Sequence, residues 1–217
     1  MVAVPIKPEY GPTLGRLLAP WWHRCSVLTR RVLIACGVVL LAGVVALVLT
    51  LLNATYSHGS PVPFSFAYRG LYSVAPEPGG YVRIEKRTAS GRLEYSLVVD
   101  PLTLPPYVGD LSGELPMYAS GYIEQLRRSY ADFVLIGEGK TRVNTVPAYD
   151  VLYTARVEGR TMYGKNVLLV AEHPVGRREG VDIVMLTAPG ASRQIEGPIE
   201  VGTTGVLMRP LRSFNLG

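Results

Sequence analysis

The stretch VLIACGVVLLAGVVALVLTLL, residues Val32–Leu52, contains 21 residues and no charged side chain. At about 1.5 Å of rise per residue, a helix of this length spans the roughly 30 Å hydrocarbon core of a bilayer. A helix also pairs its own backbone N–H and C=O groups, which a bilayer core requires. The alternative is a buried core helix, but such a helix usually carries a polar stripe, and this stretch has none. The stretch therefore predicts a single transmembrane helix.

The charges on either side of this stretch predict its orientation. Residues 1–31 contain five basic side chains and one acidic side chain, whereas the first charged residue after the stretch is Arg69. Basic residues beside a span stay on the cytoplasmic side of the membrane. We therefore expect a cytoplasmic arm at residues 1–31, a plasma-membrane helix at residues 32–52 with the lipid bilayer as its partner, and an extracytoplasmic C-terminal part.

Three targeting signals compete with an uncleaved signal anchor. Residues 33–36 (LIAC) match a lipobox, but the cysteine lies near the start of the apolar segment instead of after it. Arg30 and Arg31 resemble a twin-arginine export signal, although paired basic residues before a span also serve topology alone. A cleavable signal peptide would have a shorter apolar region and a small-residue cleavage site, which residues 51–55 (LLNAT) fit poorly. We favour the uncleaved single-pass anchor.

Charge and cysteine usage exclude several kinds of site in the C-terminal part. The formal net charge is +5, but residues 32–217 hold 17 basic and 16 acidic side chains, so the basic excess belongs to the N-terminal arm. A nucleic-acid-binding face needs its basic residues clustered in the folded domain, so we expect no nucleic-acid partner. Both cysteines, Cys25 and Cys36, precede residue 53. The C-terminal part therefore has neither a disulfide nor a thiolate metal site.

Hydrophobic periodicity predicts an α+β domain at residues 64–217. Residues 53–63 (NATYSHGSPVP) contain turn-forming residues and are predicted to be a linker. Alternating or apolar runs bounded by turn residues predict antiparallel strands at about 64–68, 81–87, 93–99, 133–137, 148–157, 161–171 and 181–186. Residues 100–115 and 139–147 are expected to be irregular. Helices are expected at about 116–130 and 200–211. The predicted architecture is a sheet of six or seven strands with both helices packed on one face.

Two short segments resemble a known superfamily. Residues 139–149 (GKTRVNTVPAY) lead into a long predicted strand, and the chain closes with Arg212-Ser213-Phe214. With the order of meander, helix and long strands, these features resemble the PsbP-like superfamily over about residues 64–214. That superfamily includes an extrinsic protein of the oxygen-evolving complex, a Ran-binding nuclear-import factor and actinobacterial cell-envelope lipoproteins. The resemblance implies a binding or assembly module and transfers no site residues. This chain departs from the lipoproteins by having an apolar span in place of a lipid-modified cysteine.

The sequence contains no recognisable catalytic or metal-binding motif. HExxH, CxxC and GxSxG are absent, and the glycine runs at 137–140 (GEGK) and 202–205 (GTTG) lack the spacing of a phosphate-binding loop. His173 follows Glu172, but adjacent residues on a strand point to opposite faces. We therefore expect no catalytic residue, no cofactor and no metal ligand, and we interpret the protein as a non-enzyme.

Tyrosine is the one enriched side chain, with 13 Tyr against 4 Phe. Because tyrosine suits surfaces that are apolar at one end and wet at the other, two interpretations stay open. The tyrosines either line a partner-binding groove or belong to a core whose hydroxyls reach the rim. Those in or near the predicted elements are Tyr107, Tyr118, Tyr122, Tyr130, Tyr149, Tyr153 and Tyr163.

Three functions are compatible with these observations. The favoured one is a binding or assembly module of the cell envelope that contacts another envelope protein or a wall or lipid component. The first alternative is an envelope hydrolase with paired carboxylates drawn from Asp100, Asp110 and Glu114. The second is a small structural subunit that is recognised through its span, along which small residues stand at Gly37, Gly43 and Ala46.

Overall fold

The computed structural model describes residues 26–52, 54–70, 72–105, 111–170 and 178–217. It contains the predicted apolar helix as α2, Val27–Leu52, which begins five residues earlier than expected. The Ser26 hydroxyl accepts a hydrogen bond from the backbone N–H of Thr29 at 3.2 Å, which caps the helix. The segment Val27–Leu49 is long and apolar enough to cross a membrane. The helix is therefore confirmed, while the membrane orientation stays a prediction.

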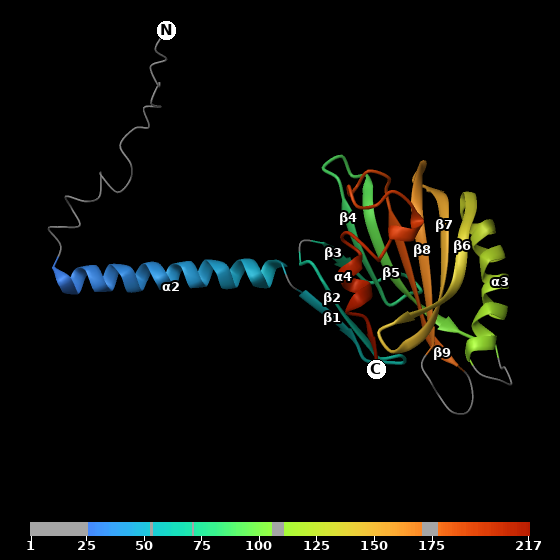
Figure 1. Ribbon diagram of the computed structural model, residues 1–217, viewed down its shortest axis with the longest axis horizontal. Coiled ribbons are helices and arrows are strands. Elements are labelled where there is room, and N and C mark those ends of the chain that lie inside the picture. Colours follow the sequence, from blue (N-terminus) through green and yellow to red (C-terminus); the bar gives the residue numbers. More distant parts are fainter. Residues whose placement is uncertain (1–25, 53, 71, 106–110, 171–177) are drawn as a thin grey trace, which may run out of the picture. The chain divides into compact units, whose positions relative to one another are not determined.

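Residues Leu51–Gly217 form a compact folded unit of their own, built from two antiparallel sheets (Figure 1). The smaller sheet has the strand order β1-β2-β10, from Ala54–His58, Phe64–Tyr68 and Asn215–Leu216. The larger sheet has the order β3-β4-β5-β9-β8-β7-β6. In chain order, its strands are β3 (Ser73–Ala75), β4 (Val82–Arg87), β5 (Leu93–Thr103), β6 (Ala131–Val143), β7 (Val146–Val157), β8 (Arg160–Val170) and β9 (Glu179–Thr187). The predicted α+β class is confirmed. Six of the seven predicted strands lie in the larger sheet, whereas the strand predicted at 64–68 is β2 of the smaller sheet, and β3 was not predicted.

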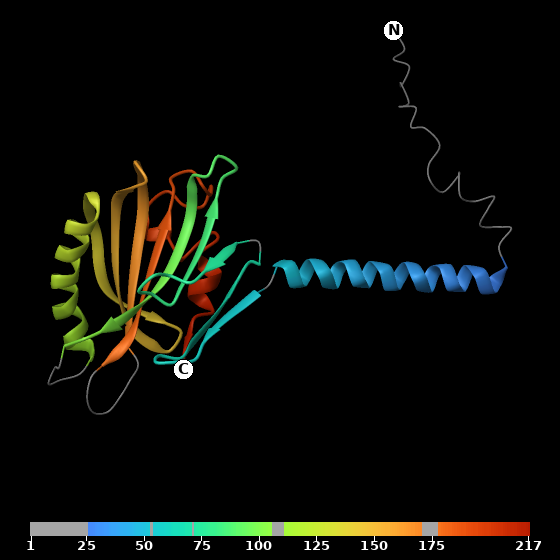
Figure 2. The ribbon, with the colours of Figure 1, turned by 180° about the vertical axis from the view of Figure 1, so that it is seen from behind.

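The two helices of this unit cover opposite faces of the larger sheet (Figures 1 and 2). Helix α3, Leu111–Ser129, packs on β6 and β7. The short helix α4, Met208–Arg212, packs on β2 and belongs to a second core on the other face. The expectation that both helices lie on one face was wrong. The central strand β8 is buried along both faces from Val167 to Val170, so each face needs a covering layer.

Strand β6 replaces the short strand and polar connection predicted at residues 133–147. It runs from Ala131 to Val143 and pairs with β7 through a tight turn at Asn144 and Thr145. The polar residues misled the prediction because β6 is an edge strand, in which alternate side chains are exposed along most of its length. Charged side chains are common on edge strands because they discourage pairing with another chain.

Both predicted helices have different bounds in the structure. Helix α3 begins at Leu111, so Pro116 lies inside it instead of in its first turn, at the cost of one backbone hydrogen bond. The expected C-terminal helix is reduced to the single turn Pro198–Glu200 and to α4. Between them, Gly202 and Gly205 have φ angles of 75° and 65°. These left-handed values interrupt a right-handed helix.

Strands occupy two segments that were expected to be irregular. Strand β1 lies within the predicted linker at residues 53–63 and pairs with β2 in the register Ala54↔Tyr68. Strand β5 continues through Pro101 to Thr103, past the last residue that pairs with β4. A two-residue turn joins β7 to β8, with positive φ at both Glu158 and Gly159, as a turn of this kind requires.

Candidate functional site

Most of the tyrosines singled out from the sequence pack between α3 and the larger sheet. Tyr149 and Tyr153 on β7 are buried, and Tyr122 and Tyr130 on or beside α3 pack against the same core. Tyr163 packs against the core of the opposite face, and Tyr107 lies outside the described residues. The core interpretation therefore holds for the tyrosines of the α3 face, of which Tyr149 also lines a cleft of about 220 Å³ beside Pro116.

A polar cluster lies within this core, and it was not anticipated from the sequence. The Tyr122 hydroxyl donates a hydrogen bond to Asp182 Oδ2, and the Asn166 amide donates to the Tyr122 hydroxyl. The same amide lies 3.2 Å from Asp182 Oδ2. The Tyr153 hydroxyl donates to Asn166 Oδ1 at 2.8 Å. The cluster therefore ties α3 to strands β7, β8 and β9 through side chains that the sheet pairing brings together.

Burial controls the ionisation of this cluster. It raises the pKa of Asp182 from 3.8 to about 7, against the opposing effect of the hydrogen bonds from Tyr122 and Asn166. The nearby Asp100 carboxylate raises this pKa further. Burial also raises the pKa of the Tyr122 hydroxyl well above its ordinary value. Asp182 is 7% exposed and its carboxylate is held by protein partners, so the cluster serves to position α3.

The structure does not assemble the three acids considered for a hydrolase into one site. Asp100 is the cross-strand neighbour of Asp182, whereas Glu114 is buried near the start of α3 and ion-paired with Arg178. Asp110 lies outside the described residues. Neither Asp100 nor Glu114 lines the clefts described below. Within the described ranges, no group of three or more His, Cys, Asp or Glu residues is arranged to hold a metal ion.

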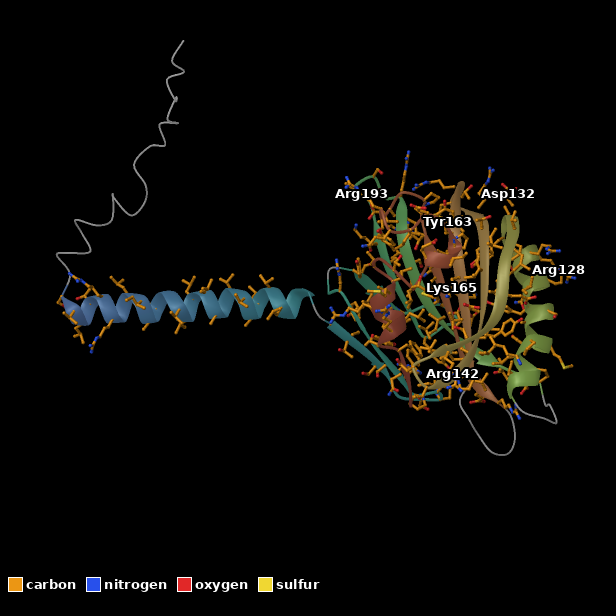
Figure 3. All side chains as sticks on the ribbon, viewed as in Figure 1. Arg128, Asp132, Arg142, Tyr163, Lys165 and Arg193 are labelled. Atoms are coloured by element: carbon orange, nitrogen blue, oxygen red, sulfur yellow. The ribbon has the colours of Figure 1, made fainter. Side chains whose placement is uncertain are left out.

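A cleft of about 210 Å³ opens on the other face, between the β6–β7 hairpin, β8 and the C-terminal segment. Its buried cation is Lys165, whose Nζ lies 3.1 Å from Asp150 Oδ2. Figure 3 labels Lys165 on the central strands and Arg142 near the β6–β7 turn. The polar side chains that line this first cleft are Thr141, Arg142, Asn144, Lys165, Thr203 and Arg212.

A second cleft of about 410 Å³ adjoins the first around α4, and Arg212 lines both. Three arginines line this second cleft: Arg69, directly after β2, and Arg209 and Arg212 on α4. Val206 and Met208 add apolar surface to the same wall. None of the described residues that line either cleft is acidic. The two clefts therefore present several hydrogen-bond donors to solvent.

The C-terminal segment is held firmly against the domain. The Ser213 hydroxyl accepts a hydrogen bond from the backbone N–H of Ala67 at 2.8 Å. The Asn144 amide donates to the Phe214 carbonyl at 2.5 Å. The Phe214 ring stacks on Phe64 and Phe66, with centroid distances of 5.4 and 5.8 Å. These contacts place α4, and with it Arg212, beside strand β2 and the β6–β7 turn.

Comparisons with known proteins place this fold. One similar structure is LpqN of Mycobacterium tuberculosis, described as involved in cell envelope biogenesis. The two chains share 13% identity and a TM-score of 0.51, over 76% of this chain and 91% of LpqN. Another is the cyanobacterial PsbP (CyanoP) of Synechocystis, with 14% identity and a TM-score of 0.50, over 77% of this chain and 94% of that one. No family model and no curated protein matches the sequence. The PsbP-like fold expected from the sequence is confirmed.

Proposed function

We propose that this chain is a non-catalytic, membrane-anchored binding or assembly module of the cell envelope, with its folded domain on the extracytoplasmic side. The observation that carries the proposal is the helix Val27–Leu52, whose apolar side chains from Val32 to Leu49 are exposed. A compact folded unit follows it in the chain. The basic arm before the helix supports the orientation. The fold shared with LpqN, a protein of envelope biogenesis, supports the setting.

The two clefts on the α4 face are the proposed contact surface. They are concave, they lie in the folded unit, and their lining includes the exposed side chains of Arg69, Arg142 and Arg212. By contrast, the buried polar cluster beneath α3 makes its hydrogen bonds within the protein. The partner under this proposal is another envelope protein or a wall or lipid component.

Cysteine labelling of intact cells tests the topology. Ser90 is exposed in the turn between β4 and β5, so the variant Ser90→Cys in a Cys25→Ser background offers a thiol on the folded domain. We expect a membrane-impermeant maleimide to label this variant in intact cells. The matched control is the native chain, whose Cys25 should react with the maleimide only after the membrane is permeabilised. If intact cells instead label the native chain at Cys25 and leave the Ser90→Cys variant unlabelled, the topology is inverted and the proposal is rejected.

Site-specific photo-crosslinking tests the binding role. A photoreactive amino acid replaces Thr203, an exposed residue of the first cleft, in the full-length chain. We expect an adduct with an envelope component that can be identified by mass spectrometry. The same substitution at Arg128, an exposed residue of α3 that lines neither cleft, is the control. Identical adducts from both positions would show that the clefts are not the contact surface.

A further inference from the structure

Arg69, Arg142 and Arg212 bring positive charge to the two clefts of a domain whose net charge is close to zero. Within the described part of the chain, Arg69, Arg142 and Arg212 form no ion pair. Five arginines elsewhere on the domain are ion-paired, as Arg87 is with Glu158 at 2.8 Å. Arg92, Arg128, Arg160 and Arg193 form no ion pair among the described residues either, but they line neither cleft. Lys165 is neutralised by Asp150. The charge left over in the two clefts is therefore carried by guanidinium groups.

These guanidinium groups come from distant parts of the chain, and the fold places them along the walls of the two clefts. Arg69 directly follows β2, Arg142 lies near the end of β6, and Arg212 ends α4. Arg212 lines both clefts, so the two share one positive rim. Like charges that line the same cleft repel one another. A bound anion would relieve this repulsion.

We propose that the two clefts that share Arg212 bind a phosphate-bearing anion. The inference rests on the binding role proposed above and gives it a ligand class. A guanidinium presents a planar fork of N–H donors that matches the oxygens of a phosphate. The oxygens of a phosphate group are arranged tetrahedrally, so arginines can approach them from more than one side of a cleft, whereas the two oxygens of a carboxylate lie in one plane.

A lipid headgroup is the source of phosphate that the second cleft fits best. Beside its arginines, this cleft carries the apolar side chains of Val206 and Met208. Arg69 follows Tyr68, which pairs with Ala54, and Ala54 is separated from the end of the apolar helix by one residue. Arg69 therefore directly follows the end of β2 that pairs with the first residue of β1. Basic residues close to a span attract anionic lipids.

Calorimetry on the full-length chain in neutral maltoside micelles tests this inference. The probes are phosphatidylglycerol and phosphatidylcholine added to the micelles, inorganic phosphate, and polyglutamate as an acidic peptide. We expect phosphatidylglycerol to bind and phosphatidylcholine not to bind. Removing two charges with Arg69→Gln and Arg212→Gln should weaken binding by about 25-fold, since each basic residue near an anionic lipid contributes about fivefold.

A charge-matched variant separates a specific site from general attraction. Arg128→Gln with Arg193→Gln removes the same charge from exposed positions that line neither cleft (Figure 3). This control should keep its affinity within about twofold, because separated surface charges are screened by salt. All four residues are exposed, so we expect both variants to fold, which circular dichroism checks. The affinity of the native chain should also fall as salt is raised.

Each result decides the inference. Binding of phosphatidylglycerol alone assigns the site to lipid headgroups, and equal binding of inorganic phosphate keeps the phosphate site but assigns it to the free anion. The inference is overturned if the two double variants lose affinity equally, if phosphatidylcholine binds as well as phosphatidylglycerol, or if only polyglutamate binds. Such a result would leave the topology labelling and the Thr203 crosslink unaffected, so it is distinguishable from failure of the proposed function.

Discussion

Replacing Asp182 with asparagine should make the folded domain more stable above pH 7 and leave it nearly unchanged near pH 4. The side chain is buried beneath α3, and burial raises its pKa from 3.8 to about 7. The folded protein therefore retains a proton, between these two pH values, that the unfolded chain has released. Proton linkage then lowers the free energy of unfolding as the pH rises through this window.

The size of the effect follows from the pKa difference. The two values, 3.8 and about 7, differ by about three units, and each unit is worth 1.36 kcal/mol. The native chain should therefore lose about 4 kcal/mol of stability from this group between pH 4 and pH 8. Asparagine has nearly the same shape and no charge, and its oxygen can still accept the hydrogen bonds from Tyr122 and Asn166. The stability of Asp182→Asn relative to the native chain should rise by about 4 kcal/mol over the same range.

Urea unfolding of the full-length chain in neutral detergent, followed by circular dichroism at pH 4 to 8, measures this difference. Subtracting the two curves removes the titration of all other groups. The matched control is Asp132→Asn, which makes the same chemical change at an exposed position of β6 whose ion pair with Arg156 lies on the surface. It should shift stability by less than about 1 kcal/mol. A stability difference between Asp182→Asn and the native chain that does not change with pH would refute the reasoning.

Three further substitutions test the packing of the two cores. Tyr153→Phe removes the 2.8 Å hydrogen bond to Asn166 Oδ1 and should lower the urea-derived free energy of unfolding by about 1–3 kcal/mol, because a buried acceptor is left unpaired; an unchanged value would contradict this. Gly164→Ala places a Cβ against the Tyr153 ring and should cost about 1–3 kcal/mol, seen as a lower Tm, whereas an equal or higher Tm would show that the ring moves aside freely. Phe214→Ala removes the ring that stacks on β2 and should cost about 3–5 kcal/mol, with faster hydrogen exchange in β2 and β10; exchange that stays slow there would rule out this anchoring role.

Elements whose pattern is local could be predicted closely. The span was recognised because 21 consecutive uncharged residues need no information from elsewhere in the chain. Strand β7 was recognised because its alternate residues from Tyr149 to Ala155 face one core, where they are buried. Helix α3 was recognised by the same kind of argument, although its start was missed because the residues before Pro116 look irregular in sequence.

Elements whose environment is set by a distant partner could not be predicted in this way. The edge strand β6 resembles a polar loop because half of its side chains face solvent, and only its pairing with β7 makes it a strand. Strand β1 lies in a stretch with a glycine and two prolines, and it forms because β2 offers hydrogen-bond partners. The clefts gave no sequence signal, since Arg69 and Arg212 are far apart in the chain.

The amino-acid sequence by itself determined the apolar helix, its basic flank, the antiparallel α+β character and the PsbP-like order of elements, because composition and periodicity over a short window decide these features. Only the tertiary structure decided that α3 and α4 cover opposite faces, that Asp182 is enclosed with Tyr122 and Asn166, and that three arginines meet around α4. The physical reason is that burial and strand pairing act between segments distant in the chain. A side chain's pKa, its partners and its access to solvent follow from that choice of neighbours.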